Sequence, residues 1–376
     1  MAPLNAKEGY VARTNLLSVG SIVLGLAAAL PACSNSTAGM NVPIEMLGSS
    51  YATASCGVFA SCFGATLLPL VAGVSSRAAC EARGQAAYVN GALPRYRAAL
   101  ASGTLSYDGT QAQACVDAYS ALGCGASTAR RPGACAQLFT GHVGMGGACA
   151  LNEECMGDAY CSTASGCPGT CQARSGSGTA CTTDDACQSG LRCGGSGATR
   201  SCSAPAGDGA ACQGQSDCGA GLLCIGASGT TAGACHPVAT AFAAASGAAC
   251  NPQAQQFCAV GLSCIITSPT SISCGAGGLA NGTPCHVSVP DQCAAGSYCS
   301  GTNAMMGMFA GTCAPLPSAG MPCASVLVGA RCADGSTCDG STCAAVVDNG
   351  AACTTNADCA GGRCMGNVCV APGYCP

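Results

Sequence analysis

A repeated cysteine pattern limits what this chain can fold into more than any other feature. Of its 376 residues, 37 are cysteine, about the share that is typical of disulfide scaffolds. From Gly146 onward, a glycine three residues before a cysteine recurs seven times at a period of 30 to 38 residues, and at least three more cysteines complete each copy. This period predicts seven tandem modules over residues 146–376. Their lead cysteines are Cys149, Cys181, Cys212, Cys250, Cys285, Cys323 and Cys353.

Each module is too small to be stabilised by a hydrophobic core. About 32 residues cannot bury enough apolar area to offset the loss of backbone entropy, and the chain has no tryptophan and only six phenylalanines. A disulfide that closes a loop of about 15 residues contributes about 3 kcal/mol. Our hypothesis is therefore first-to-third and second-to-fourth pairing, although four cysteines allow three patterns. In module one the expected disulfide residues are Cys149, Cys155, Cys161, Cys167 and Cys171.

Glycines and acids recur at fixed places within the modules. A glycine precedes each lead cysteine, and most copies have another three residues after the second cysteine. We expect both to adopt left-handed turns. An acid stands just before the second cysteine at Glu154, Asp217 and Asp358, where it would accept backbone N–H bonds. The pairs Glu153-Glu154 and Asp184-Asp185 either bind calcium or a basic partner, or simply face solvent; we favour the second interpretation, since calcium needs six to eight oxygen ligands.

The N-terminal residues predict export. Basic Lys7 and Arg13 precede an uncharged apolar stretch, Leu16 to Leu30, as in a signal peptide over residues 1–32. The sequence Leu30-Pro31-Ala32-Cys33 is similar to a bacterial lipobox, which implies lipidation at Cys33 and a flexible tether over residues 33–43. Ordinary cleavage nearby, for example after Ala38, is the alternative. Without Cys33 the cysteine count is even, as complete pairing requires.

Residues 44–140 differ from the rest. Helical spacing predicts three or four helices there, with Ser76 as the cap of one. The uncharged stretch from Gly57 to Val74 is interpreted as a buried helix and not a membrane span, because Pro69 and several polar residues interrupt it. The predicted fold class is thus a small disulfide-bridged α-helical domain followed by small disulfide-rich tandem modules, mostly irregular with short β-hairpins. The bridging cysteines expected in the helical domain are Cys56, Cys62, Cys80, Cys115, Cys124 and Cys135.

The chain lacks the sequence signatures of the common catalytic and metal sites. It contains no C-x2-C step and no G-x-S-x-G motif, and Lys7 is its only lysine. Zinc sites and thioredoxin-like sites use C-x2-C, so we expect no metal and no cofactor. Its three histidines, His142, His236 and His286, are far apart in the sequence. We therefore predict that the protein is not an enzyme and has no catalytic residues.

The modules resemble a known family from roughly Gly146 onward, and module one carries the resemblance most fully. The segment Cys149-Ala-Leu-Asn-Glu-Glu-Cys155-Met-Gly-Asp-Ala-Tyr-Cys161 resembles the start of the Dickkopf N-terminal cysteine-rich region. A helical domain followed by such modules is also similar to uncharacterised cysteine-rich lipoproteins of Gram-negative bacteria. The resemblance implies an oxidised interaction module outside the cytoplasm, lipid-anchored at the outer membrane or cell surface, or otherwise secreted.

These features together predict a binding or spacer scaffold with a protein or glycan partner. A net charge of −4 argues against nucleic acid, and membrane contact is expected only through the lipid anchor. Arginines outnumber acids in residues 44–140, and acids outnumber arginines in the modules. We therefore expect the helical domain to rest against the membrane side or another protein, with the acidic array projecting outward. The alternative is an inhibitor of extracellular proteases, with Arg192, Arg200, Arg331 or Arg363 as the target residue. The expected contact residues are Tyr160, Tyr298, Met305, Met306 and Phe309.

Overall fold

The structure is a computed structural model, and it has two parts, a helical head and a module array. The residues it describes are 41–71, 74–121, 123, 133–195, 200–214, 217–219, 221–227, 231–250, 257–268, 271–286, 292–301, 310–326 and 329–371. The head comprises α1 (Ile44–Val71), α2 (Arg77–Ala87), the π-helical turn η1 (Tyr88–Ala92), α3 (Leu93–Ala101), β1 (Leu105–Tyr107), α4 (Gly109–Ala121), the 3-10 helix η3 (Gly133–Gln137) and β2 (Phe139–Gly141).

The head is held by a small apolar core and by disulfides. Leu47 and Leu93 are buried there beside Tyr88, whose hydroxyl donates to the carbonyl of Ile44 at 2.6 Å. Gly48 allows this packing, because a Cβ at that position would lie 2.2 Å from the Tyr88 ring.

Among the described residues of the head, two disulfides join helices to their neighbours. The bond Cys56–Cys80 links α1 to α2, and Cys115–Cys135 links α4 to η3. Ser76 caps α2 as expected, since its side chain accepts from the Ala79 N–H at 3.1 Å. The prediction of a disulfide-bridged helical domain is confirmed; the side chain of Cys62 and the whole of Cys124 lie outside the described residues.

The array consists of small antiparallel sheets, one or two to a module, as predicted. Three modules have three strands with the last strand in the middle: β3 (Ala148–Cys149), β4 (Ala159–Ser162) and β5 (Gly169–Ala173); β8 (Ala211–Cys212), β9 (Leu222–Ile225) and β10 (Gly233–Pro237); β13 (Pro284–His286), β14 (Ser297–Ser300) and β15 (Ala310–Pro315). The two-stranded sheets pair β6 (Arg192–Gly194) with β7 (Ser201–Ser203), β11 (Leu262–Ser268) with β12 (Ser271–Ala276), β16 (Ala324–Val326) with β17 (Gly329–Arg331), β18 (Ser336–Asp339) with β19 (Thr342–Ala345), and β20 (Cys364–Met365) with β21 (Val368–Cys369).

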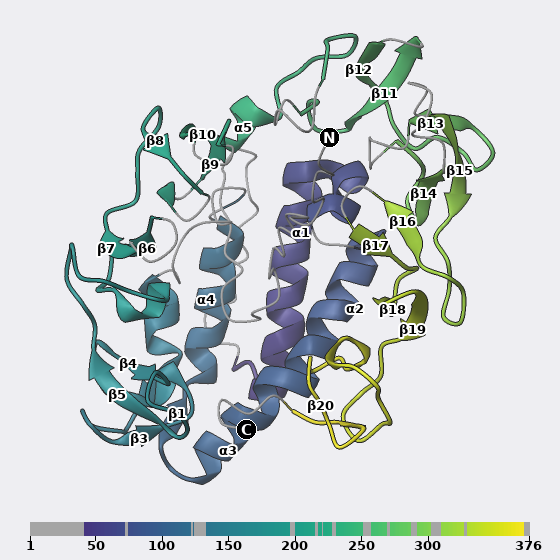
Figure 1. Cartoon of the computed structure of the whole chain (residues 1–376). Helices are drawn as coiled ribbons and strands as arrows, with labels where there is room; N and C mark the ends of the chain where they lie inside the picture. The colour runs from purple at the N-terminus through teal and green to yellow at the C-terminus, as the bar shows by residue number, and fades with distance from the viewer. Residues whose placement is uncertain are drawn as a thin grey trace, which may run out of the picture.

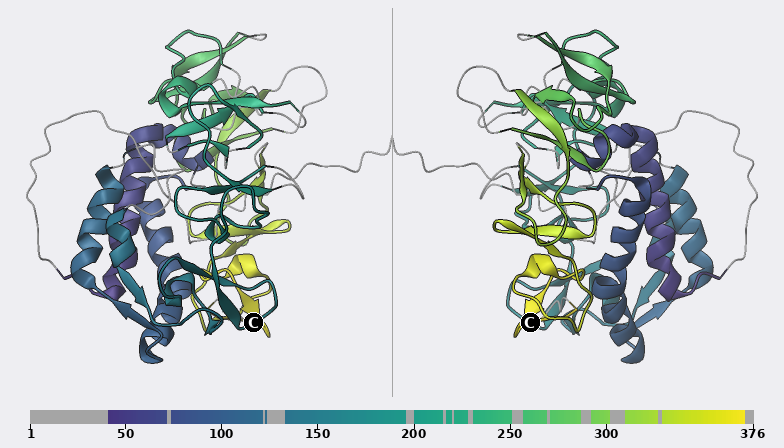
Figure 2. Two further views of the ribbon diagram at one scale, coloured as in Figure 1. Left: turned by 90° about the vertical axis from the view of Figure 1, so that its left-hand side faces the viewer. Right: turned by 90° about the vertical axis from the view of Figure 1, so that its right-hand side faces the viewer.

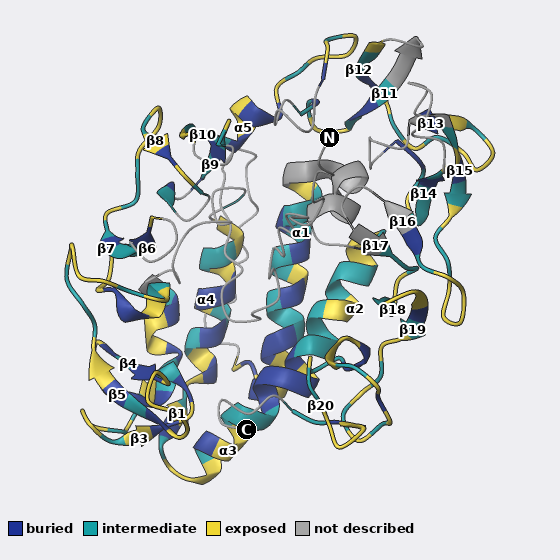
Figure 3. Cartoon of the chain, in the orientation of Figure 1, coloured by how far each residue is buried: buried dark blue, intermediate teal, exposed yellow. Residues whose placement is uncertain are grey.

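Short helical turns complete the modules. They are the 3-10 helices η4 (Asn152–Glu154), η5 (Asp184–Ala186) and η10 (Asn356–Asp358), and the four-residue helix α5 (Val238–Ala241). Within the modules most of the buried apolar residues are cysteines. Figure 3 shows short buried stretches on the strands of the modules, whereas the helices carry longer buried faces.

The modules follow an arc in a layer that lies against one side of the helices. In Figure 1 the chain runs from β3 at the lower left, over β11 and β12 at the top, to β20 at the lower right, and in this view the arc frames α1, α2 and α4. Figure 2 shows the head and the array as two layers. The two layers are held together by polar contacts that no sequence pattern indicated. The orientation of the head and the array toward a membrane or another protein stays a prediction.

Those polar contacts join residues far apart in the sequence. Ser75 before α2 donates its N–H to Asp334 of module six at 3.0 Å, and its hydroxyl also contacts that carboxylate. Asn90 of η1 donates to Asp348 of module seven at 2.8 Å. Of the described helices, none is long and apolar enough to cross a membrane.

Candidate binding surface

Every module has the same pair of disulfides. In each of the seven, the first cysteine is bonded to the third and the second to the closing cysteine, as hypothesised from the loop lengths. Module one has Cys149–Cys161 and Cys155–Cys171. The others are Cys181–Cys193 and Cys187–Cys202, Cys212–Cys224 and Cys218–Cys235, Cys250–Cys264 and Cys258–Cys274, Cys285–Cys299 and Cys293–Cys313, Cys323–Cys338 and Cys332–Cys343, and Cys353–Cys364 and Cys359–Cys369.

A backbone ring fastens the start of each module to its end. In module three the Gly209 N–H donates to the carbonyl of closing Cys235 at 2.7 Å, and the Cys235 N–H donates to Ala210 at 2.8 Å. The same two bonds recur in the other modules at 2.7–2.9 Å. The lead glycines take φ between 76° and 91°, in the left-handed region that favours glycine, so this expectation is confirmed.

The second glycine position is also left-handed. Gly190, Gly221, Gly261, Gly296, Gly335 and Gly362 all have φ between 77° and 87°. Module one has Asp158 at this place, and there the left-handed residue is Gly157, one position before it.

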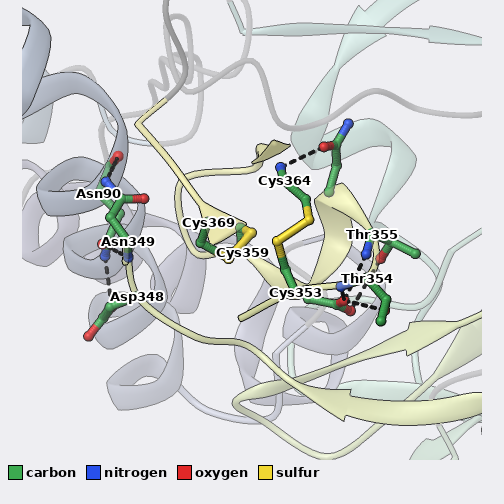
Figure 4. Close-up of a disulfide and its surroundings, with 11 residues drawn as sticks. Asn90, Asp348, Asn349, Cys353, Thr354, Thr355, Cys359, Cys364 and Cys369 are labelled. Atoms are coloured by element: carbon green, nitrogen blue, oxygen red, sulfur yellow. Dashed lines mark hydrogen bonds between the residues drawn. A yellow bond between two sulfur atoms is a disulfide. The ribbon is translucent and has the colours of Figure 1, made fainter. Parts of the chain in front are cut away.

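The acid before the second cysteine organises the turn that precedes it. Asp358 accepts the Thr354 and Thr355 N–H groups at 2.8 and 2.9 Å (Figure 4). Burial raises the pKa of Asp358, but these bonds and those from the two threonine hydroxyls outweigh it, so the pKa lies below its usual value. Asp217 in module three repeats the arrangement and also has a lowered pKa. The recurring acids thus have the structural role expected of them.

A second polar residue ties this turn to the third cysteine. Asn152, Asp184 and Asn356 occupy the first position of η4, η5 and η10, and each side chain accepts the N–H of the third cysteine of its module at 2.7–2.8 Å. In the acidic pairs, Asp184 is occupied in this way, and Asp185 accepts from the Asn152 amide of module one at 2.8 Å. The structure therefore uses these oxygens for turns and for contacts between modules.

A parallel bridge joins the linker before a module to that module in six of the seven. The residue three positions before the lead glycine pairs with the second cysteine, as in Ser175 with Cys187 and Ala206 with Cys218. In module six, Ala333 instead donates its N–H to the carbonyl of Pro317 at 2.8 Å. For module one this partner is Val143, which follows β2 of the head. The antiparallel pair of β1 and β2 in the head therefore supplies the bridging residue that a preceding module supplies elsewhere in the array.

The predicted contact residues have different outcomes. Tyr160 on β4 and Tyr298 on β14 are each half-buried, so part of each ring faces solvent, and their contact role stays a prediction. Met305, Met306 and Phe309 lie outside the described residues, as does the lipidation candidate Cys33.

Other exposed apolar side chains were not predicted from the sequence. Nine large hydrophobic side chains are exposed among the described residues, and Met145 is the most exposed at 62%. Only Val260 belongs to a middle module. The other eight belong to the head and to modules one, six and seven: Met46, Val89, Met145, Met156, Met321, Val346, Met365 and Val368. No sequence signal distinguished them, because exposure depends on how the array curves.

Several of the candidate arginines and histidines have clear partners. Arg200 donates to the carbonyls of Thr182 and Cys193 at 3.0 and 2.9 Å, and burial lowers the pKa of Arg192. Of the histidines, exposed His142 lies 2.6 Å from the Ser106 hydroxyl, and His236 lies 3.2 Å from Asp208.

The cysteines of a module are close enough to suggest a metal site by geometry alone. In several modules three sulfur atoms lie within 4.8 Å of one another. Those sulfurs are paired in disulfides, whereas metal ligation by cysteine requires the thiolate. The pairing therefore accounts for the clusters.

The chain matches no family model, no curated protein and no solved structure. The resemblance of module one to the Dickkopf region accordingly stays a prediction.

Proposed function

We propose that this protein is a non-enzymatic binding scaffold outside the cytoplasm, lipid-anchored through Cys33 at the outer membrane or surface of a Gram-negative bacterium. The observation that carries the proposal is the sixteen described disulfides, with the same pairing in all seven modules. Disulfides in such number indicate an oxidising compartment. The signal peptide and the lipobox-like sequence supply the route to that compartment.

Binding is a better-supported role than spacing. A spacer would extend, but the array curves back over the head and contacts it through modules one, six and seven. Eight of the nine exposed large hydrophobic residues belong to those same modules and to the head. Exposed methionines suit a contact that adapts to its partner. A protein or glycan partner would therefore bind on the head and the two ends of the arc.

The anchor is tested by labelling cells that make the full chain with a palmitate analogue. The wild-type protein and the control Ser34→Ala should carry the label and sediment with membranes, because the lipidated cysteine is unchanged. Cys33→Ala should lose both properties. A labelled Cys33→Ala protein would contradict the assignment of Cys33.

The oxidising compartment is tested by making the chain without residues 1–32 in a reducing cytosol. We expect thiols that react with an alkylating reagent before reduction and rapid digestion by protease. The exported full chain should show neither. Equal protease resistance of the two preparations would contradict the hypothesis that disulfides maintain the fold of the array.

The binding role is tested by adding the fluorescent full chain to intact cells of the producing bacterium, and to cells treated with protease or glycosidases. Saturable binding is expected, and the treatment that removes it identifies the partner as protein or glycan. The double variant Met145→Ser, Met156→Ser should weaken binding at least tenfold, while Val260→Ser should not. No saturable binding to any of these cells would refute the role.

A further inference from the structure

One cysteine of module one is bonded outside its own module. The described part of the chain contains 33 disulfide-bonded cysteines, and 32 of them form the sixteen pairs within the head and within single modules. Cys167 is the remaining one and is also disulfide-bonded. Its partner is therefore one of the four other cysteines in the sequence: Cys33, Cys62, Cys124 or Cys375.

Cys62 and Cys124 suit each other better than either suits Cys167. The helices α1 and α4 begin together, since the Val42 N–H donates to the Gly109 carbonyl at 3.0 Å. They then pack side by side, with the Tyr51 and Tyr119 rings 5.1 Å apart. In the sequence, Cys62 follows the first residue of α1 by 18 positions and Cys124 follows the first residue of α4 by 15.

The two ends of the array meet at one helical segment of the head. Asn90 of η1 holds Asp348 and Asn349 of module seven, at 2.8 and 2.9 Å (Figure 4). Six residues later, the Tyr96 hydroxyl reaches Glu153 of module one at 3.5 Å. Six residues of helix rise about 9 Å, so modules one and seven are fastened close to each other.

The last module fits this helical segment closely. A Cβ on Gly361 would lie 2.7 Å from the carbonyl oxygen of Asn90, so a larger residue would force the two apart. Asn349 also donates to that carbonyl at 2.8 Å. Cys369, the closing cysteine of module seven, is thereby brought to the same end of the head as module one, and Cys375 follows it by six residues. Such a segment can span up to about 20 Å.

We infer that Cys167 is bonded to Cys375, so that a disulfide joins module one to the segment after module seven and closes the array into a ring. To form the bond, each thiol gives up one proton and one electron. A thiol–disulfide oxidoreductase of the compartment, in its disulfide form, accepts the two electrons and two protons and becomes a dithiol. Cys33 is excluded because its proposed lipidation uses the thiol, so this one step rests on the proposed function, whereas the placement of Cys375 near module one rests on the contacts above.

Cleavage of the unreduced wild-type chain at methionine by cyanogen bromide tests this bond. Cleavage at Met145 and Met321 divides the chain into residues up to 145, 146–321 and 322–376. Within 146–321 the cysteine-containing fragments stay joined by Cys155–Cys171 and Cys293–Cys313. Within 322–376 they stay joined by Cys359–Cys369. None of the sixteen described disulfides connects these three groups.

A bond from Cys167 to Cys375 predicts that 146–321 and 322–376 migrate as one covalent species without reductant and separate after reduction. Separation of the two groups without reductant would overturn the inference, as would attachment of 322–376 to a fragment from residues 1–145.

Two cysteine variants give an independent test on the full chain. Cys375→Ser should free one thiol, and alkylation before reduction, followed by peptide mapping, should place the label on Cys167. The matched control Cys124→Ser should free Cys62 and leave Cys167 unlabelled. Label on any cysteine other than Cys167 in the Cys375→Ser protein would refute the assignment.

Discussion

The head and the array are stabilised in different ways. In the head, Leu47, Tyr88, Leu93 and their neighbours form an apolar core, and two described disulfides add to it. In six of the seven modules, all but module six, the buried cluster consists mainly of the cysteines themselves. A chain this poor in large apolar residues can thus form a single hydrophobic core, and it relies on covalent bonds for the remaining units.

Full reduction of the disulfides should give the largest difference in stability between the head and the array. Each disulfide of a small module typically contributes about 2–5 kcal/mol, more than a core of four cysteines can replace. We expect reduced, alkylated protein to lose the array while the helical signal in far-ultraviolet circular dichroism largely remains. Proteolysis with fragment mapping should locate the cuts beyond residue 146. Equal loss of both parts would contradict the account in which the apolar core is enough to maintain the head without its disulfides.

Removal of core volume should have a large effect on the head. Leu47→Ala leaves a cavity at a position only 2% exposed, which typically costs about 2–5 kcal/mol. Thermal unfolding followed by the helical signal should shift downward by several degrees. Met46→Ala, at the exposed neighbouring position, is the matched control and should change little. A similar shift for both variants would contradict the core assignment.

A lead glycine should have a smaller effect within its module. Gly209 has a φ of 76°, and no atom lies within 4 Å of the Cβ that an alanine would add there. Gly209→Ala therefore introduces backbone strain without a clash, at a cost of roughly 1–2 kcal/mol. Hydrogen exchange should report faster opening of module three only. Gly207→Ala, also in open space and without positive φ, serves as control; equal effects would argue against strain.

The pH dependence should be the smallest difference. Because the pKa of Asp358 is lowered in the folded protein, its contribution is present above the unfolded pKa of about 3.9 and is lost as the pH falls through the folded value. Module seven should therefore open more readily as the pH falls from about 5 to about 3. Asp358→Asn should flatten that dependence in hydrogen exchange. An unchanged slope would mean that this carboxylate does not stabilise the turn.

Local features were predictable and the arrangement of the modules was not. The disulfide pairing, the left-handed glycines and the Ser76 cap depend on residues close in the sequence, where spacing restricts the geometry. The contact of Asn90 with Asp348 joins positions 258 residues apart, and neither residue belongs to a repeated pattern. Likewise, Val143 occupies the position that Ser175 has before module two, but the sequence does not show this because no module precedes module one.

The parallel bridge that passes the chain from one module to the next also gives the number of modules a geometric meaning. Seven modules bring the chain back to the head, where Asp348 of the last one contacts Asn90 of η1. Deletion of one internal module would leave the other modules folded, but module seven would no longer reach Asn90. The number of modules in this architecture thus determines whether the array closes. Gain or loss of one module would first disrupt the contact between the last module and η1.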